Sequence, residues 1–207
     1  MKILTEYLAE NFLEEEGFKI VQRILTHNKD QALNAAKHIG FPVVLKISSN
    51  SLLHKSEKNA VKLDIKEENF SKTYDELDLI KIEKQGIIVQ KYINGKFILL
   101  GLKKDPTFGH IILVCVGGIY TEIIKDTAMR ITPINKNQAL EMVKELKSYK
   151  ILGGFRGEKV NINLIVEALL KLSKISQRCP SIKELDINPL IVNENSAEVV
   201  DARIIFD

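Results

Sequence analysis

Two segments near the end of the chain place carboxylates and an amide where they could bind a hydrated cation. Ile182–Val192 and Ala197–Phe206 are rich in isoleucine and valine, and the polar run Asn193-Glu194-Asn195-Ser196 separates them. This pattern is typical of a β-hairpin. If the turn is symmetric about its centre, Asn188 lies directly opposite Asp201.

Strand side chains alternate between faces, so one face of this hairpin would carry the polar groups. These are Glu184, Asp186, Asn188, Asp201 and Arg203. The other face would carry core residues, namely Leu185, Ile187, Val200, Ala202 and Ile204. Mg²⁺ prefers oxygen donors, usually one or two from protein and the rest from water and phosphate. The polar face therefore predicts a magnesium site. An ordinary solvated sheet face is the alternative, and Pro189 could add a bulge that shifts the register.

A lysine stands inside an apolar run earlier in the chain. Lys46 belongs to Pro42–Ser48, whose almost continuous apolar character predicts a central strand. Lysine is rarely buried without a partner, so we expect an anion or the edge of a purine ring beside it. A lysine that extends its head to solvent from an edge strand is the alternative.

Two further segments could meet a nucleotide. His54 and Lys55 lie in the polar loop Ser49–Asn59, between two apolar strands, where they could contact phosphate, although a lone histidine in such a loop is more often a surface residue. Ile88–Tyr92 lies where the chain would leave one lobe for another. Backbone N–H and C=O groups exposed there could pair with an adenine edge.

The elements that must position these residues alternate along the chain. Helical periodicity and helix caps predict helices at Thr5–Glu16, Lys29–Ile39, Glu67–Ile80, Gln138–Tyr149 and Asn161–Arg178. Besides the hairpin, apolar runs predict strands at Phe18–Leu25, Pro42–Ser48, Ala60–Ile65, Ile87–Ile93, Lys96–Lys103 and Ile111–Val116, and one or two more within Ile119–Ile131. The fold class is α+β. We expect a division near Gln90–Asn94 into lobes 1–89 and 90–207, with a cleft between them.

Composition narrows the class of protein. With 207 residues, 45% hydrophobic and 28% charged, the chain is typical of a globular protein. A net charge of +3 is too small to predict a nucleic-acid partner. No run reaches the ~18 apolar residues that would span a membrane, and Glu6 follows Met1 too closely for a secretory signal. Cys115 and Cys179 are isolated, as expected of reduced thiols in the cytoplasm.

Several ordered motifs together are highly specific. They are Leu4-Thr5-Glu6-Tyr7, Gly40-Phe41-Pro42-Val43-Val44-Leu45-Lys46, Leu53-His54-Lys55-Ser56-Glu57, Lys104-Asp105-Pro106-Thr107-Phe108-Gly109, Gly117-Gly118-Ile119-Tyr120-Thr121-Glu122 with Lys125-Asp126, Leu152-Gly153-Gly154-Phe155-Arg156-Gly157, Glu184-Leu185-Asp186-Ile187-Asn188-Pro189 and Val200-Asp201-Ala202-Arg203. With these motifs the chain resembles, nearly end to end, the ATP-grasp β subunit or β domain of the ADP-forming acetyl-CoA (acyl-CoA) synthetases. These enzymes are relatives of succinyl-CoA synthetase.

The resemblance implies a reaction. Acyl-CoA and phosphate give acyl phosphate and CoA on a partner α subunit, which carries the CoA-binding domain. A histidine of that partner takes the phosphoryl group, and a swinging segment delivers it to ADP in the ATP-grasp cleft. By resemblance His54 relays the phosphoryl group, a role that suits a neutral imidazole.

The resemblance also implies binding roles. Asn188 and Asp201 would hold Mg²⁺ on the phosphates, which agrees with their expected pairing across the hairpin. The nucleotide (ATP or ADP) would be contacted by residues of both lobes: Lys46, Lys55, Asn59, Ala60, Gln90, Lys91, Tyr92 and Lys96.

Three positions depart from the family pattern. Asn59-Ala60 stands where two glycines usually let backbone N–H groups approach phosphate. Asparagine tolerates left-handed backbone better than most residues, and alanine does so poorly. Lys96 replaces a glutamate that reaches the ribose hydroxyls, and Cys115 replaces the first glycine of Gly-x-Gly-Gly. Sequence drift and loss of nucleotide turnover both explain these changes.

Three functions therefore stay open. The first is an enzyme subunit, an ADP-forming acetate–CoA ligase β subunit that makes ATP from acyl-CoA or runs in reverse. The second is a degenerate ATP-grasp module that binds its α partner with little or no nucleotide chemistry. The third is an ATP-grasp ligase that acts alone on another carboxylate. The sequence contains no CoA-binding domain and no recognisable acyl pocket, which disfavours the third.

Overall fold

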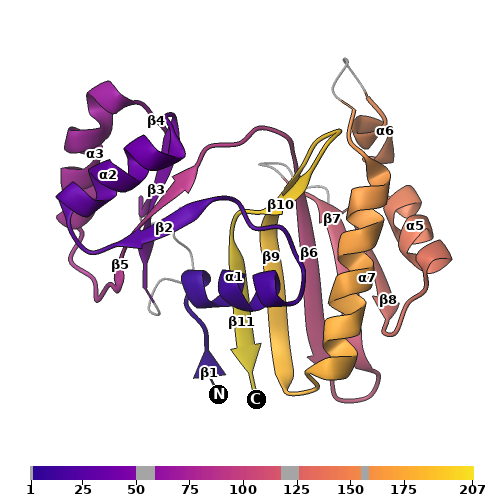
Figure 1. Ribbon diagram of the computed structural model, residues 1–207. Coiled ribbons are helices and arrows are strands. Elements are labelled where there is room, and N and C mark those ends of the chain that lie inside the picture. Colours follow the sequence, from indigo (N-terminus) through magenta and orange to yellow (C-terminus); the bar gives the residue numbers. More distant parts are fainter. Residues whose placement is uncertain (1, 50–58, 118–125, 155–158) are drawn as a thin grey trace. The chain divides into compact units, whose positions relative to one another are not determined.

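The computed structural model describes residues 2–49, 59–117, 126–154 and 159–207 (Figure 1). The chain divides into two compact units, each built on its own antiparallel sheet. The smaller unit comprises Thr5–Leu8 and Val21–Ile93, and the larger unit comprises Met1–Leu4, Ala9–Ile20 and Asn94–Asp207. The N-terminal segment thus contributes to both units. The division into lobes 1–89 and 90–207 stays a prediction.

The smaller unit contains a four-stranded sheet in the order β2-β5-β3-β4. Its strands are β2 (Arg23–Thr26), β3 (Val43–Ser48), β4 (Val61–Ile65) and β5 (Gly86–Lys91). Helices α2 (Lys29–Ile39) and α3 (Glu67–Asp78) pack on the sheet (Figure 1). Strand β3 is an internal strand, as its apolar run predicts.

The two faces of this sheet carry different residues. The face under the helices is an apolar core that includes Val43, Leu45, Ile47, Ile87 and Val89. Because side chains alternate along a strand, the other face carries the intervening residues of β3 and β5 and their neighbour on β2. We call this set the polar face of the smaller sheet, and it comprises Arg23, Val44, Lys46, Ser48, Ile88 and Gln90.

The larger unit is built on a seven-stranded antiparallel sheet in the order β1-β11-β9-β6-β7-β8, with β10 also paired to β9. Its strands are β1 (Lys2–Ile3), β6 (Lys96–Asp105), β7 (Gly109–Val116), β8 (Thr127–Ile131), β9 (Ile182–Val192), β10 (Ala197–Val199) and β11 (Ala202–Phe206). Strand β9 occupies the middle of the sheet between β6 and the pair β10 and β11. The C-terminal hairpin predicted from the sequence is thus confirmed, and it lies within a larger sheet.

Helices cover one face of the larger sheet. Helix α7 (Ile162–Arg178) runs along it, and α5 (Lys136–Glu145) packs against both α7 and β8 (Figure 1). The core beneath includes Leu100 of β6 and Leu172 of α7, neither of which is exposed to solvent. Most of helix α1 (Glu6–Glu15), from Ala9 onward, groups with this unit.

The expected strand Phe18–Leu25 is wrong over its first half. Phe18 and Ile20 pack into the core of the larger unit, and only Arg23–Thr26 pairs with β5 in the smaller one. The chain changes units at Val21. An apolar run of this length reads as one strand because periodicity does not reveal which core each side chain enters.

The expected helix Gln138–Tyr149 is two elements. Asn135 and Gln138 form a capping box, with reciprocal side-chain to backbone hydrogen bonds, so α5 begins at Lys136. It ends at Glu145, and a separate short helix, α6 (Tyr149–Leu152), follows. Within the described part of the chain no helix is long and apolar enough to cross a membrane.

Asp126 fastens the turn before α6. Its carboxylate accepts hydrogen bonds from the backbone N–H groups of Lys147 (2.8 Å) and Ser148 (2.7 Å) and from the Ser148 hydroxyl. Burial by itself raises the pKa of Asp126, but the hydrogen bonds from Ser148 and Lys147 outweigh it, so the pKa lies below its usual value.

Asp126→Asn is expected to lower the free energy of unfolding by about 2–4 kcal/mol, because the amide NH₂ would face backbone donors and a charge-assisted bond would be lost. A depressed carboxyl pKa stabilises the fold above the unfolded-state value and loses this effect as pH falls through the folded-state value. The gap between wild type and variant should therefore be constant above about pH 5 and shrink below about pH 4, as urea denaturation would measure. A gap that stays constant at acid pH would contradict this role.

Candidate functional site

Lys46 has its partner within the smaller unit. Its ammonium nitrogen lies 3.0 Å from Oε1 of Glu6, and the two residues are only 3% and 4% exposed. Lys46 is in β3, and Glu6 is the first residue of α1, 40 positions earlier. The expected anion is thus supplied by the chain itself, and the alternative of an edge-strand lysine that reaches solvent is wrong.

The first turn of α1 makes a second contact with the same face. The guanidinium of Arg23 lies over the ring of Tyr7, 5.5 Å from its centroid. Arg23 is paired with Gln90 across β2 and β5. Gln90 is fully buried on this face, paired also with Val44 of β3. Two of the predicted nucleotide residues, Lys46 and Gln90, therefore share one face of the sheet.

Asn59 and Ala60 enter β4 without strain at the alanine. Asn59 has φ of 54°, in the left-handed region, and is exposed. Ala60 is fully buried in the core of the smaller unit, and its carbonyl accepts a hydrogen bond from the N–H of Ile47 (3.0 Å). The left-handed position thus falls on the residue that tolerates it, and the alanine methyl adds to the core.

The end of β5 leads toward the larger unit with its backbone partly bonded. The N–H of Lys91 donates to the carbonyl of Gln22 (2.9 Å), and the N–H of Tyr92 donates to that of Pro42 (3.3 Å). Lys91 itself is exposed, and Tyr92 is half-buried. These two N–H groups therefore bond within the smaller unit, which removes them from the set of backbone donors expected for adenine.

In the larger unit the predicted cross-strand pair is confirmed. The N–H of Asn188 donates to the carbonyl of Asp201 (3.0 Å), and Asp186 lies opposite Arg203. Asn188 is exposed and Asp201 half-buried, so both are open to solvent to some degree. An amide and a carboxylate oxygen at paired positions fit the donor set that Mg²⁺ uses together with water and phosphate. The described residues contain no cluster of three or more His, Cys, Asp or Glu side chains that could hold a metal by themselves.

A bulge of β9 against β6 at Asn188-Pro189 interrupts the alternation of side chains, but the register across the hairpin is not shifted there, so the register shift considered for Pro189 is wrong. Leu100 of β6 pairs with Ile187, but Ile98 pairs with Leu190, so two residues of β9 face one of β6. The expectation that Val200 enters the core is wrong. Val199 is fully buried instead, and Val200 is half-buried. The bulge changes which side chains face inward just beyond Asn188 and Asp201.

Asp186 is a titratable group beside this pair. Burial, and then the neighbouring Glu184 carboxylate, raise the pKa of Asp186 to about 6, against the lowering effect of the charges on Arg203 and Lys103. Protonation of this carboxyl therefore falls near neutral pH.

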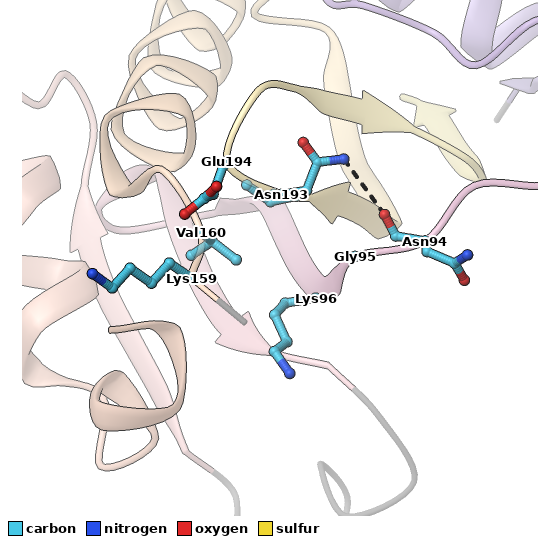
Figure 2. A pocket seen from close by; sticks show the side chains of 8 residues that line it. Asn94, Gly95, Lys96, Lys159, Val160, Asn193 and Glu194 are labelled. Atoms are coloured by element: carbon cyan, nitrogen blue, oxygen red, sulfur yellow. Dashed lines mark hydrogen bonds between the residues drawn. The ribbon is translucent and has the colours of Figure 1, made fainter. Parts of the chain in front are cut away.

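Lys96 lines a pocket at the start of β6. The pocket has a volume of about 490 Å³ and lies wholly within the larger unit. Figure 2 shows the residues around it, with the amide nitrogen of Asn193 donating to the backbone carbonyl of Asn94 at 3.4 Å. Its lining residues are Asn94, Gly95, Lys96, Lys159, Val160, Val192, Asn193 and Glu194. The pocket is thus mainly polar, with charges of both signs.

The predicted relay residue His54 and its neighbour Lys55 lie outside the described residues.

These features can be compared with known proteins. The family described as ATP-grasp domain matches residues 1–206. The β subunit of ADP-forming acetate–CoA ligase I from Pyrococcus furiosus is 37% identical over 98% of this chain and 91% of its own length. The chain belongs to the family of ATP-grasp β subunits and domains of ADP-forming acetate–CoA ligases.

Relatives in this family have two architectures. ADP-forming acetate–CoA ligase I from Archaeoglobus fulgidus is 40% identical over 94% of the chain, but the chain spans only 30% of that protein's length. A solved structure of acetyl-coenzyme A synthetase 1 from Ca. Korarchaeum cryptofilum, in complex with coenzyme A and Mg-AMPPCP, is 35% identical and has a TM-score of 0.87. The match covers 100% of this chain and 93% of that one, and the phosphohistidine segment of that structure points toward its nucleotide-binding site. The ATP-grasp fold and the ligase family expected from the motifs are therefore confirmed.

The sequence does not connect Glu6 with Lys46. An acidic residue in the first turn of a helix is explained by the helix dipole alone, so neither the motif Leu4-Thr5-Glu6-Tyr7 nor the helix predicts a partner for Glu6. The signal was the buried lysine, which needed an anion somewhere in the chain.

Proposed function

We propose that this chain is the β subunit of an ADP-forming acetate–CoA or acyl-CoA ligase. The reaction is acyl-CoA + ADP + phosphate = acid + CoA + ATP, in either direction. An α subunit that carries a CoA-binding domain and a phosphohistidine is the partner, in a cytoplasmic hetero-oligomer. The observation that carries the proposal is the match over nearly the full length of a relative that is itself a separate β subunit.

Within this reaction the chain binds the nucleotide and receives the phosphoryl group. Lys46 and Gln90 on the polar face of the smaller sheet, with Lys55, Asn59, Ala60, Lys91, Tyr92 and Lys96, contact the nucleotide. Asn188 and Asp201 hold Mg²⁺, which when bound neutralises charge on the phosphates. His54 relays the phosphoryl group between the partner and ADP. Phosphoryl transfer depends mainly on positioning and charge neutralisation, and a lysine, a metal and backbone donors provide both.

The departures from the family pattern do not favour the degenerate module. The φ of Asn59 and the burial of Ala60 show that the entry into β4 is formed without the two glycines.

Coexpression with an α subunit is expected to give ADP-dependent ATP formation from acetyl-CoA and phosphate, and neither chain alone should do so. Millimolar MgADP should also raise the melting temperature of the chain, because a ligand that binds only the folded state stabilises it by about 2.7 kcal/mol at a hundred times its Kd.

The two measurements separate the candidate functions. A melting shift without ATP formation by the folded complex would mean that the chain binds nucleotide but does not turn it over. If MgADP causes no melting shift and the complex forms no ATP, the degenerate module that only binds its partner is favoured. ATP hydrolysis coupled to another carboxylate by the chain alone would favour the solo ligase.

A further inference from the structure

The Glu6–Lys46 pair is an unusual feature of the smaller unit because almost no water reaches it. The side chains of Lys46 and Glu6 are 4% and 1% exposed, and their charged atoms lie 3.0 Å apart. Removing two ions from water costs several kcal/mol each, and a hydrophobic pair of similar volume is often as stable or more so. Stability of the fold alone therefore does not account for this pair.

The pair lies where the proposed function needs a fixed cation. Lys46 and Gln90 are on the same face of adjacent strands, β3 and β5, away from the apolar core. Ser48 lies two residues farther along β3 and is also buried. Except for Val44 and Ile88, this face is made of groups that donate or accept hydrogen bonds.

The segment Thr5–Leu8 holds the carboxylate in place. It belongs to the smaller unit although most of α1 does not. Tyr7 packs under the guanidinium of Arg23, next to Glu6 in sequence, so two consecutive side chains contact the polar face. A carboxylate on the first turn of a helix, anchored by its neighbour, has little freedom to move away from the lysine.

We propose that Glu6 is a positioning residue for nucleotide binding, which acts by holding the ammonium group of Lys46 in a fixed direction on the polar face. This inference rests on the proposed function. A free lysine side chain loses rotamer entropy when it is ordered, equivalent to about a 10- to 30-fold change in Kd. Because Glu6 holds Lys46, this entropy is lost when the chain folds and not when the nucleotide binds.

The test measures the Kd of MgADP by calorimetry on the full chain, together with melting temperature. Glu6→Gln keeps the shape and removes the charge, and we expect the Kd to rise about 10- to 30-fold, the ratio that corresponds to the rotamer entropy of one lysine side chain. Glu6→Asp keeps the charge on a shorter side chain, so its Kd should lie between those of wild type and Glu6→Gln. Glu15→Gln removes an exposed carboxylate from the same helix and should leave the Kd unchanged.

A second pair of variants tests whether Glu6 acts through Lys46. In a Lys46→Met background, Glu6→Gln should cause no further rise in Kd, since the group that it positions is gone. Lysine ¹³Cε resonances of the wild type provide a signature that does not depend on the folding of the Glu6 variants. The signal that is missing in Lys46→Met should shift when MgADP is added.

The outcomes distinguish the inference from the proposed function. A wild type that binds no MgADP would overturn the proposed function itself. If wild type binds but folded Glu6→Gln binds equally well or more tightly, Glu6 does not position Lys46. If the ¹³Cε chemical shift of Lys46 does not change when MgADP binds, the inference is overturned even if Glu6→Gln fails to fold. A further rise in Kd when Glu6→Gln is added to Lys46→Met would show that Glu6 does not act through Lys46.

Discussion

Replacing His54 with alanine is expected to abolish ATP formation by the complex of this chain with its α partner. In the proposed reaction His54 carries the phosphoryl group covalently, and alanine has no atom that could accept it. Loss of a covalent nucleophile costs on the order of a thousandfold or more in turnover. The affinity for MgADP should be unchanged, because the relay residue is not required to hold the nucleotide.

The experiment compares acid-labile phosphate on the chain and ATP formation in the coupled assay. During turnover the wild type should carry phosphate on His54, and His54→Ala should carry none. His38→Ala is the matched control, since His38 is exposed near the end of α2 in the same unit. Full activity of His54→Ala, with phosphate found only on the partner's histidine, would show that the relay does not exist.

Asp201→Asn is expected to weaken Mg²⁺-dependent nucleotide binding by on the order of 10- to 100-fold. Mutation of a residue that only orients a metal ligand typically lowers metal affinity by this factor, and removing the charge of the ligand itself should lower it at least as much. Asparagine keeps the size of the side chain and one oxygen. Asp201 is half-buried at an interruption between β10 and β11, so the backbone pairing with Asn188 should survive.

The measurement is the Kd of ADP with and without Mg²⁺, with urea denaturation as a check on folding. Glu141→Gln is the control, because this exposed carboxylate lies on α5 of the same unit, outside the hairpin. If Asp201→Asn unfolds the chain and leaves the Mg²⁺ dependence of any folded fraction unchanged, then Asp201 is a structural residue.

Local signals predicted most of the individual elements. Helix α2 matches its predicted range, Lys29–Ile39, because Asn28 caps its start and Gly40 ends it. The turn after β6 is set by Asp105, whose carboxylate accepts from the N–H groups of Thr107 and Phe108. Such interactions lie within a few residues, so the sequence contains all that is needed to predict them.

The paired positions of the candidate metal site were also predictable. The register of a hairpin follows from the length of its turn, which is why Asn188 is bonded to Asp201. The change of face beyond this pair was not predictable in detail. It arises at a bulge opposite β6, a strand that lies more than 80 residues away in the sequence.

The sequence alone determined the order of most helices and strands, the antiparallel hairpin and, through its motifs, the ligase family. Only the tertiary structure decided that Phe18 and Ile20 belong with the larger unit and that Lys46 is paired with Glu6. The reason is physical. Periodicity and turns depend on neighbours in sequence, whereas burial and the pairing of charges depend on which distant segments meet, and 40 residues separate Glu6 from Lys46.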